Sequence, residues 1–553
     1  MGWPPSFILS LLLALPLLAT PANASIEPSS NYNSLVRTTT SGSVLGYRDN
    51  VTIPNTPICK WLGIRYGADT GGSNRWRPPQ RVIAPPVGAV FNATQFGPAC
   101  LQGRADGGNG TAIQSEDCLR INVFAPENAT GLPVYIYIHG GGFDSGASSD
   151  PKIDGSFLAA RGIVFASINY RLSLFGFPHA KEIEDAGQTQ NLGLLDTRLA
   201  VEWMRDNAAV FGGDPAKMTL GGESVGAEMT NLYMFAYHGN PIVRAAIMQS
   251  GDTLQPMWPL NEQIAYIAQD LKCPTGKGLL DCLRRVPGDQ LRQSLLKTKT
   301  QFQPVVDNVT VFKDAVRQTK LGKTARIPLL IGTNKDEGTL IVEGEPTAYL
   351  NTTAPYVASR NLNFPLASAA GLAEYYPTPS DAYPTVYNVS AGMWRDAHML
   401  CLAHNLGKWR TESLKLPVWR YRYDLVASNL NSRGVRIGAF HGSDIRFVMG
   451  TVDTIVKSPP YVPATPEQRL ISALLVTAWT NFVKDPFNGP QVPGWKRFND
   501  SDKTSLAILG LSTSSVGSLD HTVIDKPCEY WNELLPSFPA TFPSCWANGT
   551  WTC

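Results

Sequence analysis

The sequence has little excess charge of either sign. Its 47 lysines and arginines nearly balance its 45 aspartates and glutamates, which leaves a net charge of +2. Nucleic-acid-binding surfaces need clustered positive charge, and no local basic run is present, so binding to nucleic acid is not expected. No segment repeats at a fixed period, which argues against a solenoid or a propeller. Hydrophobic residues make up 43% of the chain, enough to bury a large globular core.

Metal-binding sequence motifs are also missing. None of the nine cysteines forms a C-x-x-C pair and no H-E-x-x-H motif occurs, so no metal site is expected. In an oxidising compartment, nine cysteines are better explained as disulfides with one cysteine left over. The cysteines are Cys59, Cys100, Cys118, Cys273, Cys282, Cys401, Cys528, Cys545 and Cys553.

Only one long apolar run is present, and it lies at the start of the chain. Residues 7–19 are almost all hydrophobic, and Ala22-Asn23-Ala24 follows as an A-x-A cleavage site. Pro16 interrupts the run, which is also shorter than the ~20 residues of a membrane span. Although the usual lysine or arginine is missing before the run, the pattern favours a cleaved signal peptide at residues 1–24 over a membrane anchor. No later run predicts a membrane span and residues 541–553 lack the apolar tail of a GPI signal, so a secreted, extracellular protein is predicted.

Sequons for N-glycosylation agree with this secretory route. A single N-x-S/T triplet is weak evidence, but nine follow the predicted signal peptide, so several are expected to carry glycans. The candidate asparagines are Asn50, Asn92, Asn109, Asn128, Asn308, Asn351, Asn388, Asn499 and Asn548.

Short apolar runs alternate with helical patterns from residue 132 onward. Runs of β-branched and aromatic residues indicate buried strands, and apolar residues at helical spacing indicate a helix over residues 195–210. This alternation predicts an α/β fold with a mainly parallel twisted sheet and helices on both faces. The expected strands are Leu132–Ile138, Gly162–Tyr170, Met218–Gly222, Ala245–Gly251 and Pro328–Gly332.

The rest of the chain adds two less regular segments. Residues 25–80 are expected to be a lead-in rich in turns. Residues 340–410 carry few strand signals and are expected to form a largely helical insertion. No linker separates two compact halves, so residues 25–553 are predicted to form a single domain.

The third of these strands runs into Gly222-Glu223-Ser224-Val225-Gly226, a G-x-S-x-G pattern. The pattern alone is weak, but a strand before it and a helical stretch after it are what a nucleophile elbow requires. In such an elbow the serine lies on a tight, strained turn with its hydroxyl exposed. Ser224 is therefore a candidate nucleophile, and the alternative is an ordinary serine in a glycine-rich turn.

Three consecutive glycines, residues 140–142, follow the first strand. A serine nucleophile needs N–H donors for the oxyanion that forms, and glycines offer their amides with no side chain in the way. Such a loop is costly directly after a buried strand unless something must approach it closely, although a merely flexible loop is the alternative. His139 beside the glycines is expected to be structural.

Together these segments resemble the type-B carboxylesterase/lipase family of α/β-hydrolases, which includes cholinesterases, fungal lipases and secreted carboxylesterases. The resemblance implies the α/β-hydrolase fold and a serine carboxylic-ester hydrolase whose partner is a small-molecule ester. It covers the chain almost from end to end. The matching segments are Trp61–Gly67, Glu116–Val123, His139–Phe143, Asn169–Leu172, Phe211–Pro215, Gly222–Gly226, Asn334–Gly338, His441–Asp444 and Trp531–Asn532.

The resemblance also implies a Ser–Glu–His triad in that chain order. Ser224 matches the nucleophile and His441 matches the base that accepts its proton. Either Asp336 or Glu337 could be a surface carboxylate when seen alone, and adjacency does not choose between them. The resemblance selects Glu337 as the acid that orients His441.

An oxyanion hole follows from the same resemblance. It implies N–H donors from Gly141, Gly142 and Val225. Val225 stands where the family usually has alanine, and its branched side chain is expected to narrow the pocket. Glu223, directly before the serine, is a candidate to tune the electric field of the site. The implied mechanism requires no cofactor and no metal.

Disulfide pairings are likewise implied by the resemblance. Cys100–Cys118 and Cys273–Cys282 match two family disulfides, and Cys401 with Cys528 resembles a third. Cys545 and Cys553 could bridge locally and leave Cys59 free, but the sequence does not decide this.

The segment between Cys100 and Cys118 is where family lipases carry an amphipathic lid. Here residues 101–117 are short, polar and rich in glycine, and they lack the apolar face with which a lid opens onto lipid. They also lack a tryptophan for a choline headgroup, which such sites bind by cation–π contact. Both a triglyceride lipase and a cholinesterase are therefore disfavoured.

A non-catalytic binding protein on the same fold, like the neuroligins, is the alternative of another class. Such proteins lose the serine, whereas this sequence keeps the serine, the acid, the histidine and the oxyanion glycines. A secreted serine esterase remains the main prediction.

Overall fold

The apolar run at residues 132–138 lies in the middle of the main sheet in the computed structural model of the chain. This strand, β9 (Leu132–Ile138), runs parallel to β10 (Val164–Ile168) on one side and to β11 (Gly213–Glu223) on the other. Every residue of β10 is buried. A strand buried on both faces needs cover on both, which is why its sequence is a continuous apolar run and not an alternating one.

The structure describes most of the chain. The described residues are 35–84, 88–103, 113–251, 263–342, 372, 374–377, 380–381, 383–430, 437–453, 462–534, 546–547 and 550–551. Within these ranges, no helix is both long and apolar enough to cross a membrane. Outside these ranges lies the predicted signal peptide. The same holds for three of the sequon asparagines, Asn109, Asn351 and Asn548, and for two cysteines, Cys545 and Cys553.

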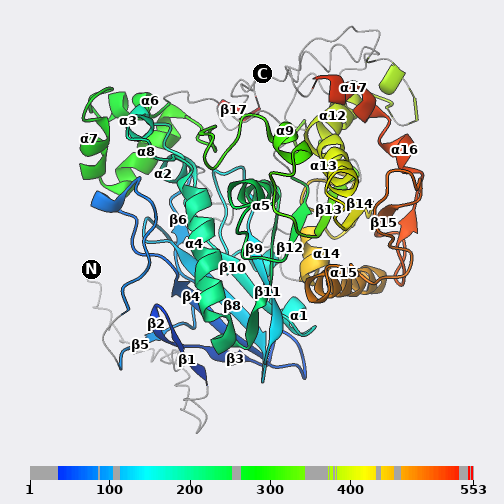
Figure 1. Cartoon of the computed structure of the whole chain (residues 1–553), viewed down its shortest axis with the longest axis horizontal. Coiled ribbons are helices and arrows are strands. Elements are labelled where there is room, and N and C mark those ends of the chain that lie inside the picture. Colours follow the sequence, from blue (N-terminus) through cyan, green and yellow to red (C-terminus); the bar gives the residue numbers. More distant parts are fainter. Residues whose placement is uncertain are drawn as a thin grey trace, which may run out of the picture.

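The other strands of the main sheet are β3 (Tyr47–Asp49), β4 (Ile58–Arg65), β8 (Arg120–Pro126), β12 (Ala245–Gln249), β13 (Leu329–Asn334), β14 (Val418–Tyr423), β15 (Leu506–Leu509) and β16 (Gly517–Ser518). Their order is β16-β15-β14-β13-β12-β11-β9-β10-β8-β4-β3. From β15 to β10 every neighbouring pair is parallel, and the pairs at both edges are antiparallel. The predicted mainly parallel sheet is therefore confirmed (Figure 1).

Smaller sheets pair β1 (Val36–Thr39), β2 (Gly42–Leu45) and β5 (Val90–Asn92), then β6 (Ala99–Cys100) with β7 (Gln114–Ser115), and β17 (Trp546–Ala547) with β18 (Thr550–Trp551). The α-helices are α1 (Ser156–Ala159), α2 (Ser173–Gly176), α3 (Lys181–Asp185), α4 (Leu192–Asn207), α5 (Val225–Ala236), α6 (Ile264–Asp270), α7 (Leu279–Arg285), α8 (Gly288–Thr298), α9 (Ala315–Lys320), α12 (Val386–Arg395), α13 (Cys401–Glu412), α14 (Ile445–Met449), α15 (Pro466–Lys484), α16 (His521–Ile524) and α17 (Pro527–Leu534). Short 3₁₀ turns span Gly72–Asn74, Pro151–Ile153 and Ala208–Phe211, and Asp396–Leu400 is π-helical.

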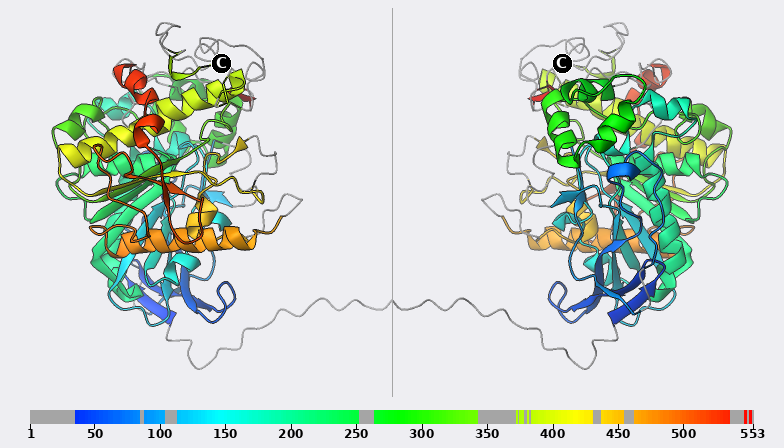
Figure 2. Two further views of the ribbon diagram at one scale, coloured as in Figure 1. Left: turned by 90° about the vertical axis from the view of Figure 1, so that its right-hand side faces the viewer. Right: turned by 90° about the vertical axis from the view of Figure 1, so that its left-hand side faces the viewer.

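Each face of the sheet has its own hydrophobic core, with helices around the sheet (Figure 2). Along β9, Ile136 belongs to one core and its neighbours Tyr135 and Tyr137 belong to the other, because alternate side chains of a strand point to opposite faces. The first core includes residues of α4 and α5, and the second includes Trp479 and Phe482 of α15.

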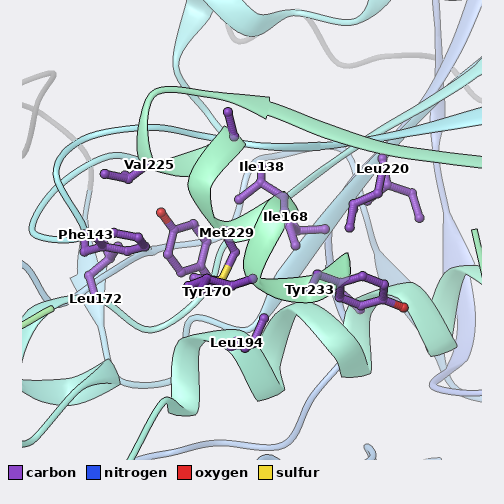
Figure 3. Close-up of a cluster of buried hydrophobic side chains, with 14 of the residues drawn as sticks. Ile138, Phe143, Ile168, Tyr170, Leu172, Leu194, Leu220, Val225, Met229 and Tyr233 are labelled. Atoms are coloured by element: carbon purple, nitrogen blue, oxygen red, sulfur yellow. The ribbon is translucent and has the colours of Figure 1, made fainter. Parts of the chain in front are cut away.

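Figure 3 shows part of the first core below the end of β11. Ile138 and Leu220 of the sheet lie beside Met229 and Tyr233 of α5, and Leu194 of α4 closes the cluster. All five of these side chains are 0% exposed. The packing fixes α5 against the sheet, and α5 begins directly after the candidate nucleophile.

The expected strands all form, but residues 25–80 are not the turn-rich lead-in that was expected throughout. Residues 36–65 contain β1 to β4, so the prediction of a turn-rich segment is wrong there. The reason lies in β4, where the polar Lys60 breaks the apolar pattern. Its ammonium is buried between Asp49, 2.7 Å away, and Asp154, 3.1 Å away, and long-range partners of this kind are not visible in a local sequence window.

The helical expectations hold where residues are described. The helix predicted over residues 195–210 is α4, which begins three residues earlier and continues into the 3₁₀ turn at residues 208–211. In the expected insertion, α12, the π-helical turn and α13 make a continuous helical run from Val386 to Glu412.

All three disulfides implied by the resemblance are present. They join Cys100 to Cys118, Cys273 to Cys282, and Cys401 to Cys528. Cys59 is a free, buried cysteine on β4.

Removal of the Cys401–Cys528 disulfide is expected to destabilise the protein. The bond closes a loop of 127 residues, and long loops restrict the unfolded chain most, so the double substitution Cys401→Ala with Cys528→Ala should lower the free energy of unfolding by about 2–4 kcal/mol. Thermal denaturation at a fixed scan rate measures the loss. The matched control is Cys273→Ala with Cys282→Ala, which opens a loop of only 9 residues and should cost less. A larger loss for the short loop would contradict this reasoning.

Candidate active site

The candidate nucleophile lies on a sharp turn between β11 and α5. Ser224 has a φ of 57° and a ψ of −131°, a region that L-residues with a side chain rarely adopt. Its N–H donates a hydrogen bond to the carbonyl oxygen of Gln249 at the end of β12, 2.9 Å away. The structure thus has the strand–turn–helix geometry that the G-x-S-x-G pattern predicts.

The two glycines of the pattern are required by close backbone packing. A Cβ atom at Gly222 or at Gly226 would collide with the carbonyl oxygen of Ile138, the last residue of β9. Without side chains, the turn lies directly against the end of β9.

The glycine loop that follows β9 lies beside Ser224. A Cβ built on Gly140 would be 3.0 Å from the Cβ of Ser224 and 2.8 Å from the carbonyl oxygen of Glu223. Gly141 and Gly142 have φ values of 120° and 68°, which favour glycine. The loop can therefore approach the serine more closely than any loop with side chains.

His139 has a structural environment. Its ring stacks on Tyr170 at a centroid distance of 4.8 Å, and burial lowers its pKa to about 4. A histidine that is neutral and packed in this way agrees with the structural role expected from the sequence.

Glu337 and His441 form a short hydrogen-bonded pair. The His441 Nδ1 atom is 2.6 Å from Glu337 Oε2, and the Glu337 side chain is fully buried. The other oxygen, Oε1, accepts a hydrogen bond of 2.6 Å from the N–H of Asn334, the last residue of β13. Both carboxylate oxygens thus have fixed partners, which orients the imidazole ring.

Asp336 points to a different partner. Its Oδ2 atom accepts a hydrogen bond of 2.8 Å from the N–H of Ala439, two residues before His441. Of the two adjacent carboxylates, only Glu337 contacts the imidazole, whereas Asp336 holds the loop on which His441 lies.

A second carboxylate approaches His441 from the serine side. Glu223 Oε1 is 3.5 Å from His441 Nε2, and burial raises the pKa of Glu223 to about 7. Burial alone would lower the pKa of His441, but the charges of Glu223 and Glu337 outweigh it and raise that pKa to about 9. The sequence identified Glu223 as a candidate but did not predict its contact with His441. Nothing in the local pattern places residue 223 beside residue 441.

Polar residues behind the pair complete a buried network that the sequence did not predict as part of the site. Asp444 Oδ2 accepts a hydrogen bond from Gln249 Nε2 at 2.9 Å, and Gln249 Oε1 accepts one from Trp479 Nε1 at 3.2 Å. Asn334 Nδ2 donates to Asp444 Oδ1 at 3.2 Å and to the carbonyl oxygen of Phe440 at 2.8 Å. Asn334 and Asp444 lie in segments that carry the family resemblance, which was the available signal, whereas Gln249 and Trp479 offered none.

Comparison with known proteins agrees with this geometry. The carboxylesterase family model matches residues 33–531. The chain belongs to the carboxylesterase family. It is therefore an α/β-hydrolase and a carboxylic ester hydrolase.

Individual members of the family align over most of their length. The chain is 31% identical to para-nitrobenzyl esterase of Bacillus subtilis, over 85% of this chain and 94% of that protein. It is 29% identical to secreted lipase 5 of Gibberella zeae, over 90% of this chain and 94% of that protein. Carboxylesterase 5A of Felis catus is 28% identical, over 91% of this chain and 94% of that protein.

For this carboxylesterase, the substitution Glu223→Gln is expected to change the pH dependence of ester hydrolysis. A base must be neutral to accept a proton, so the acidic limb of kcat/KM reports the pKa of His441 in the free enzyme. Loss of the Glu223 charge removes one cause that raises this pKa, so the acidic limb should move to lower pH by roughly one unit. The measurement is kcat/KM for a soluble ester from pH 5 to 10.

A remote carboxylate provides the control for this shift. Glu127 is exposed and pairs with Arg48, so Glu127→Gln should leave the acidic limb in place. An unchanged limb in Glu223→Gln, or a move to higher pH, would show that Glu223 does not act on His441.

Proposed function

We propose that this carboxylesterase hydrolyses small-molecule esters through an acyl-enzyme on Ser224. His441 serves as the base and then as the acid, and Glu337 orients it. The observation that carries the proposal is the buried Glu337–His441 pair beside the strained turn of Ser224, with Glu223 in contact with the imidazole. Secretion and the catalytic roles of these residues are part of the proposal.

Acylation follows from the orientation of the imidazole. Because Nδ1 donates to Glu337, the unprotonated nitrogen is Nε2, and it accepts the proton of Ser224 as Oγ bonds to the ester carbonyl carbon. The negative charge that develops on the carbonyl oxygen is stabilised by the N–H groups of Gly141, Gly142 and Val225. The bond to the leaving alkoxide then breaks, and Nε2 gives its proton to form the alcohol.

Deacylation repeats these steps with water. His441 Nε2 takes a proton from a water molecule, the hydroxide attacks the acyl carbon, and Ser224 leaves with the proton from His441. The product is the carboxylic acid. Glu337 stays ionised throughout and stabilises the imidazolium formed in each half-reaction.

Inhibition by a fluorophosphonate separates this proposal from a non-catalytic binding protein. The purified chain should hydrolyse a soluble chromogenic ester and lose that activity as the reagent is added to one equivalent. A folded protein with no esterase activity and no loss on treatment would favour the binding-protein alternative.

The start of the segment between Cys100 and Cys118 is hydrogen-bonded to Gly146, four residues after the three consecutive glycines. Gln102 Nε2 donates to the carbonyl oxygen of Gly146 at 2.5 Å, and the Gln102 Oε1 atom accepts from the N–H of Gly146 at 3.2 Å. Residues 104–112 lie outside the described residues, so the polar character of this segment rests on its sequence. We propose from it that the enzyme needs no lipid interface, although relatives named as lipases keep the triglyceride lipase as the competing candidate.

Kinetics on esters of graded chain length test this point. With a short-chain soluble ester, the rate should rise smoothly and saturate below the solubility limit, because burying the polar segment in lipid would cost hydration. A sharp rise in rate as the ester forms an emulsion, with long-chain triglyceride preferred, would restore the lipase alternative. Heat-denatured enzyme at the same ester concentrations is the control for spontaneous hydrolysis.

We also propose that residues 1–24 are removed as a signal peptide and that residues 25–553 form one secreted, glycosylated domain. In support, Asn50, Asn92, Asn128, Asn308 and Asn499 are exposed, while Asn388 is half-buried. Treatment of the secreted protein with an N-glycosidase should lower its mass, and N-terminal sequencing should begin at Ser25.

A further inference from the structure

A cluster of two histidines and one aspartate lies among the C-terminal elements of the chain. His404 is on α13, His521 is the first residue of α16, and Asp500 is in the connection between α15 and β15. One ring nitrogen of each histidine and one oxygen of Asp500 lie within 4.8 Å of one another. His404 is 9% exposed and His521 is 1% exposed, so the cluster is buried on the side of its imidazoles.

A second aspartate, Asp525, fixes the orientation of both imidazoles. Its Oδ2 atom is 2.9 Å from His404 Nδ1 and 3.1 Å from His521 Nδ1. Arg420 donates to both oxygens of Asp525, at 2.5 Å and 2.6 Å, which keeps this carboxylate ionised and able only to accept.

The protons of both imidazoles are therefore on Nδ1. Arg420 Nη1 is also 3.2 Å from His404 Nδ1, but the shorter contact is with the Asp525 oxygen, which requires a proton between the two atoms. In a neutral imidazole this leaves Nε2 as an unprotonated lone pair. A carboxylate that accepts from Nδ1 while Nε2 faces a metal is the usual outer-shell arrangement of histidine ligands.

Within the described part of the chain, neither Nε2 atom accepts a hydrogen bond from a donor. His521 Nε2 is buried and has no hydrogen-bond partner among the described residues. His404 Nε2 is 3.7 Å from Asp500 Oδ1, which is beyond hydrogen-bonding distance, and in this tautomer both atoms are acceptors. A buried acceptor without a partner is costly, and a ligand bound at His521 Nε2 would offset that cost.

We propose that His404, His521 and Asp500 bind a divalent transition metal ion, with Zn²⁺ the best fit. Two imidazole nitrogens and one carboxylate oxygen are ligands that Zn²⁺ prefers, and a water molecule would complete a tetrahedron. Metal–ligand bonds of about 2.0–2.2 Å require these atoms to draw together from their present separation. The exposed edge at Asp500, whose side chain is 21% exposed, provides the path for entry.

This ion would have a structural role. It would link α13, which also carries Cys401 of the disulfide to Cys528, to α16 and to the loop before β15. Sequence motifs did not reveal the site because its ligands are spread over 118 residues with no regular spacing, and only the fold brings them together.

The Lys408 ammonium would compete with the proposed metal ion for the Asp500 carboxylate. Its ammonium is 2.6 Å from Asp500 Oδ2, which leaves Oδ1 as the oxygen directed at the histidines. The Lys408 side chain is 36% exposed and can turn to solvent when the ion binds. Removal of its charge by Lys408→Met should therefore tighten Zn²⁺ binding.

Titration of the full-length protein with Zn²⁺ tests the proposal. After treatment with a chelator and dialysis, calorimetry should show one saturable Zn²⁺ site per chain. Asp500→Ala should weaken binding at least about tenfold, since even outer-shell changes cost that much. The matched control is Asp502→Ala, two residues away in the same loop and paired with Lys496, which should bind like the wild type.

Two further readouts distinguish this site from adventitious binding. Zn²⁺ should raise the melting temperature of the wild type and of Asp502→Ala but not of Asp500→Ala, and Co²⁺ in its place should give the visible absorption of a tetrahedral site. Circular dichroism checks that each variant is folded. Absence of saturable Zn²⁺ binding, or equal affinity in Asp500→Ala and the wild type, would overturn the proposal.

Discussion

Substitution of Ser224 by alanine is expected to lower the rate of ester hydrolysis by about 10⁴-fold or more. Loss of Oγ removes the proposed nucleophile, while Glu337 and His441 keep their hydrogen bond. Alanine keeps the Cβ atom, so it fits the same turn with the φ of 57°. The measurement is kcat/KM for a soluble ester, together with loss of labelling by a fluorophosphonate.

The matched control for this substitution is Ser173→Ala. Ser173 also has a positive φ, 48°, begins a helix and is fully buried, and its Oγ atom has no hydrogen-bond partner among the described residues. The Ser173→Ala variant should therefore keep near-normal esterase activity. Near-normal turnover in a folded Ser224→Ala variant would instead disprove the assignment of the nucleophile.

The substitution Glu337→Gln should lower kcat by roughly 10³-fold, through the tautomer of His441. The N–H of Asn334 donates to one side-chain oxygen of residue 337, so glutamine will place its own oxygen there. Its NH₂ group then faces His441 Nδ1, which must become the acceptor. The proton moves to Nε2, and the imidazole can no longer accept the proton of Ser224.

The adjacent Asp336→Asn provides the control. Its carboxylate accepts a hydrogen bond from the N–H of Ala439, and an asparagine oxygen can accept the same bond, so kcat should fall less than about tenfold. Comparison of kcat for the two variants under one set of conditions separates the two carboxylates. A larger loss in Asp336→Asn would show that the wrong acid was chosen.

Much of the fold could be predicted because its central strands are buried on both faces. Continuous apolar runs such as Leu132–Ile138 give β9 with its observed bounds. The edge of the sheet was harder. β4 carries Lys60, whose charge is compensated by Asp49 and Asp154, and such partners become neighbours only after folding.

Only part of the candidate site could be predicted from the sequence, as with the fold. Ser224 and its glycines were predictable, because an elbow constrains residues that are adjacent in the chain. Glu337 and His441 needed the family resemblance, since they are 104 residues apart and meet only through β13 and the loop before α14. The contact of Glu223 with His441 and the cluster at His404 could not be predicted, because no local pattern encodes them.

The most direct test of the catalytic account is the site of covalent modification in the wild-type protein. Active enzyme treated with a fluorophosphonate and digested should be mapped by mass spectrometry. One adduct per chain is predicted, on the peptide that contains Ser224, with labelling in proportion to lost esterase activity. Full loss of activity with the adduct on another residue, or with no adduct at all, would contradict it.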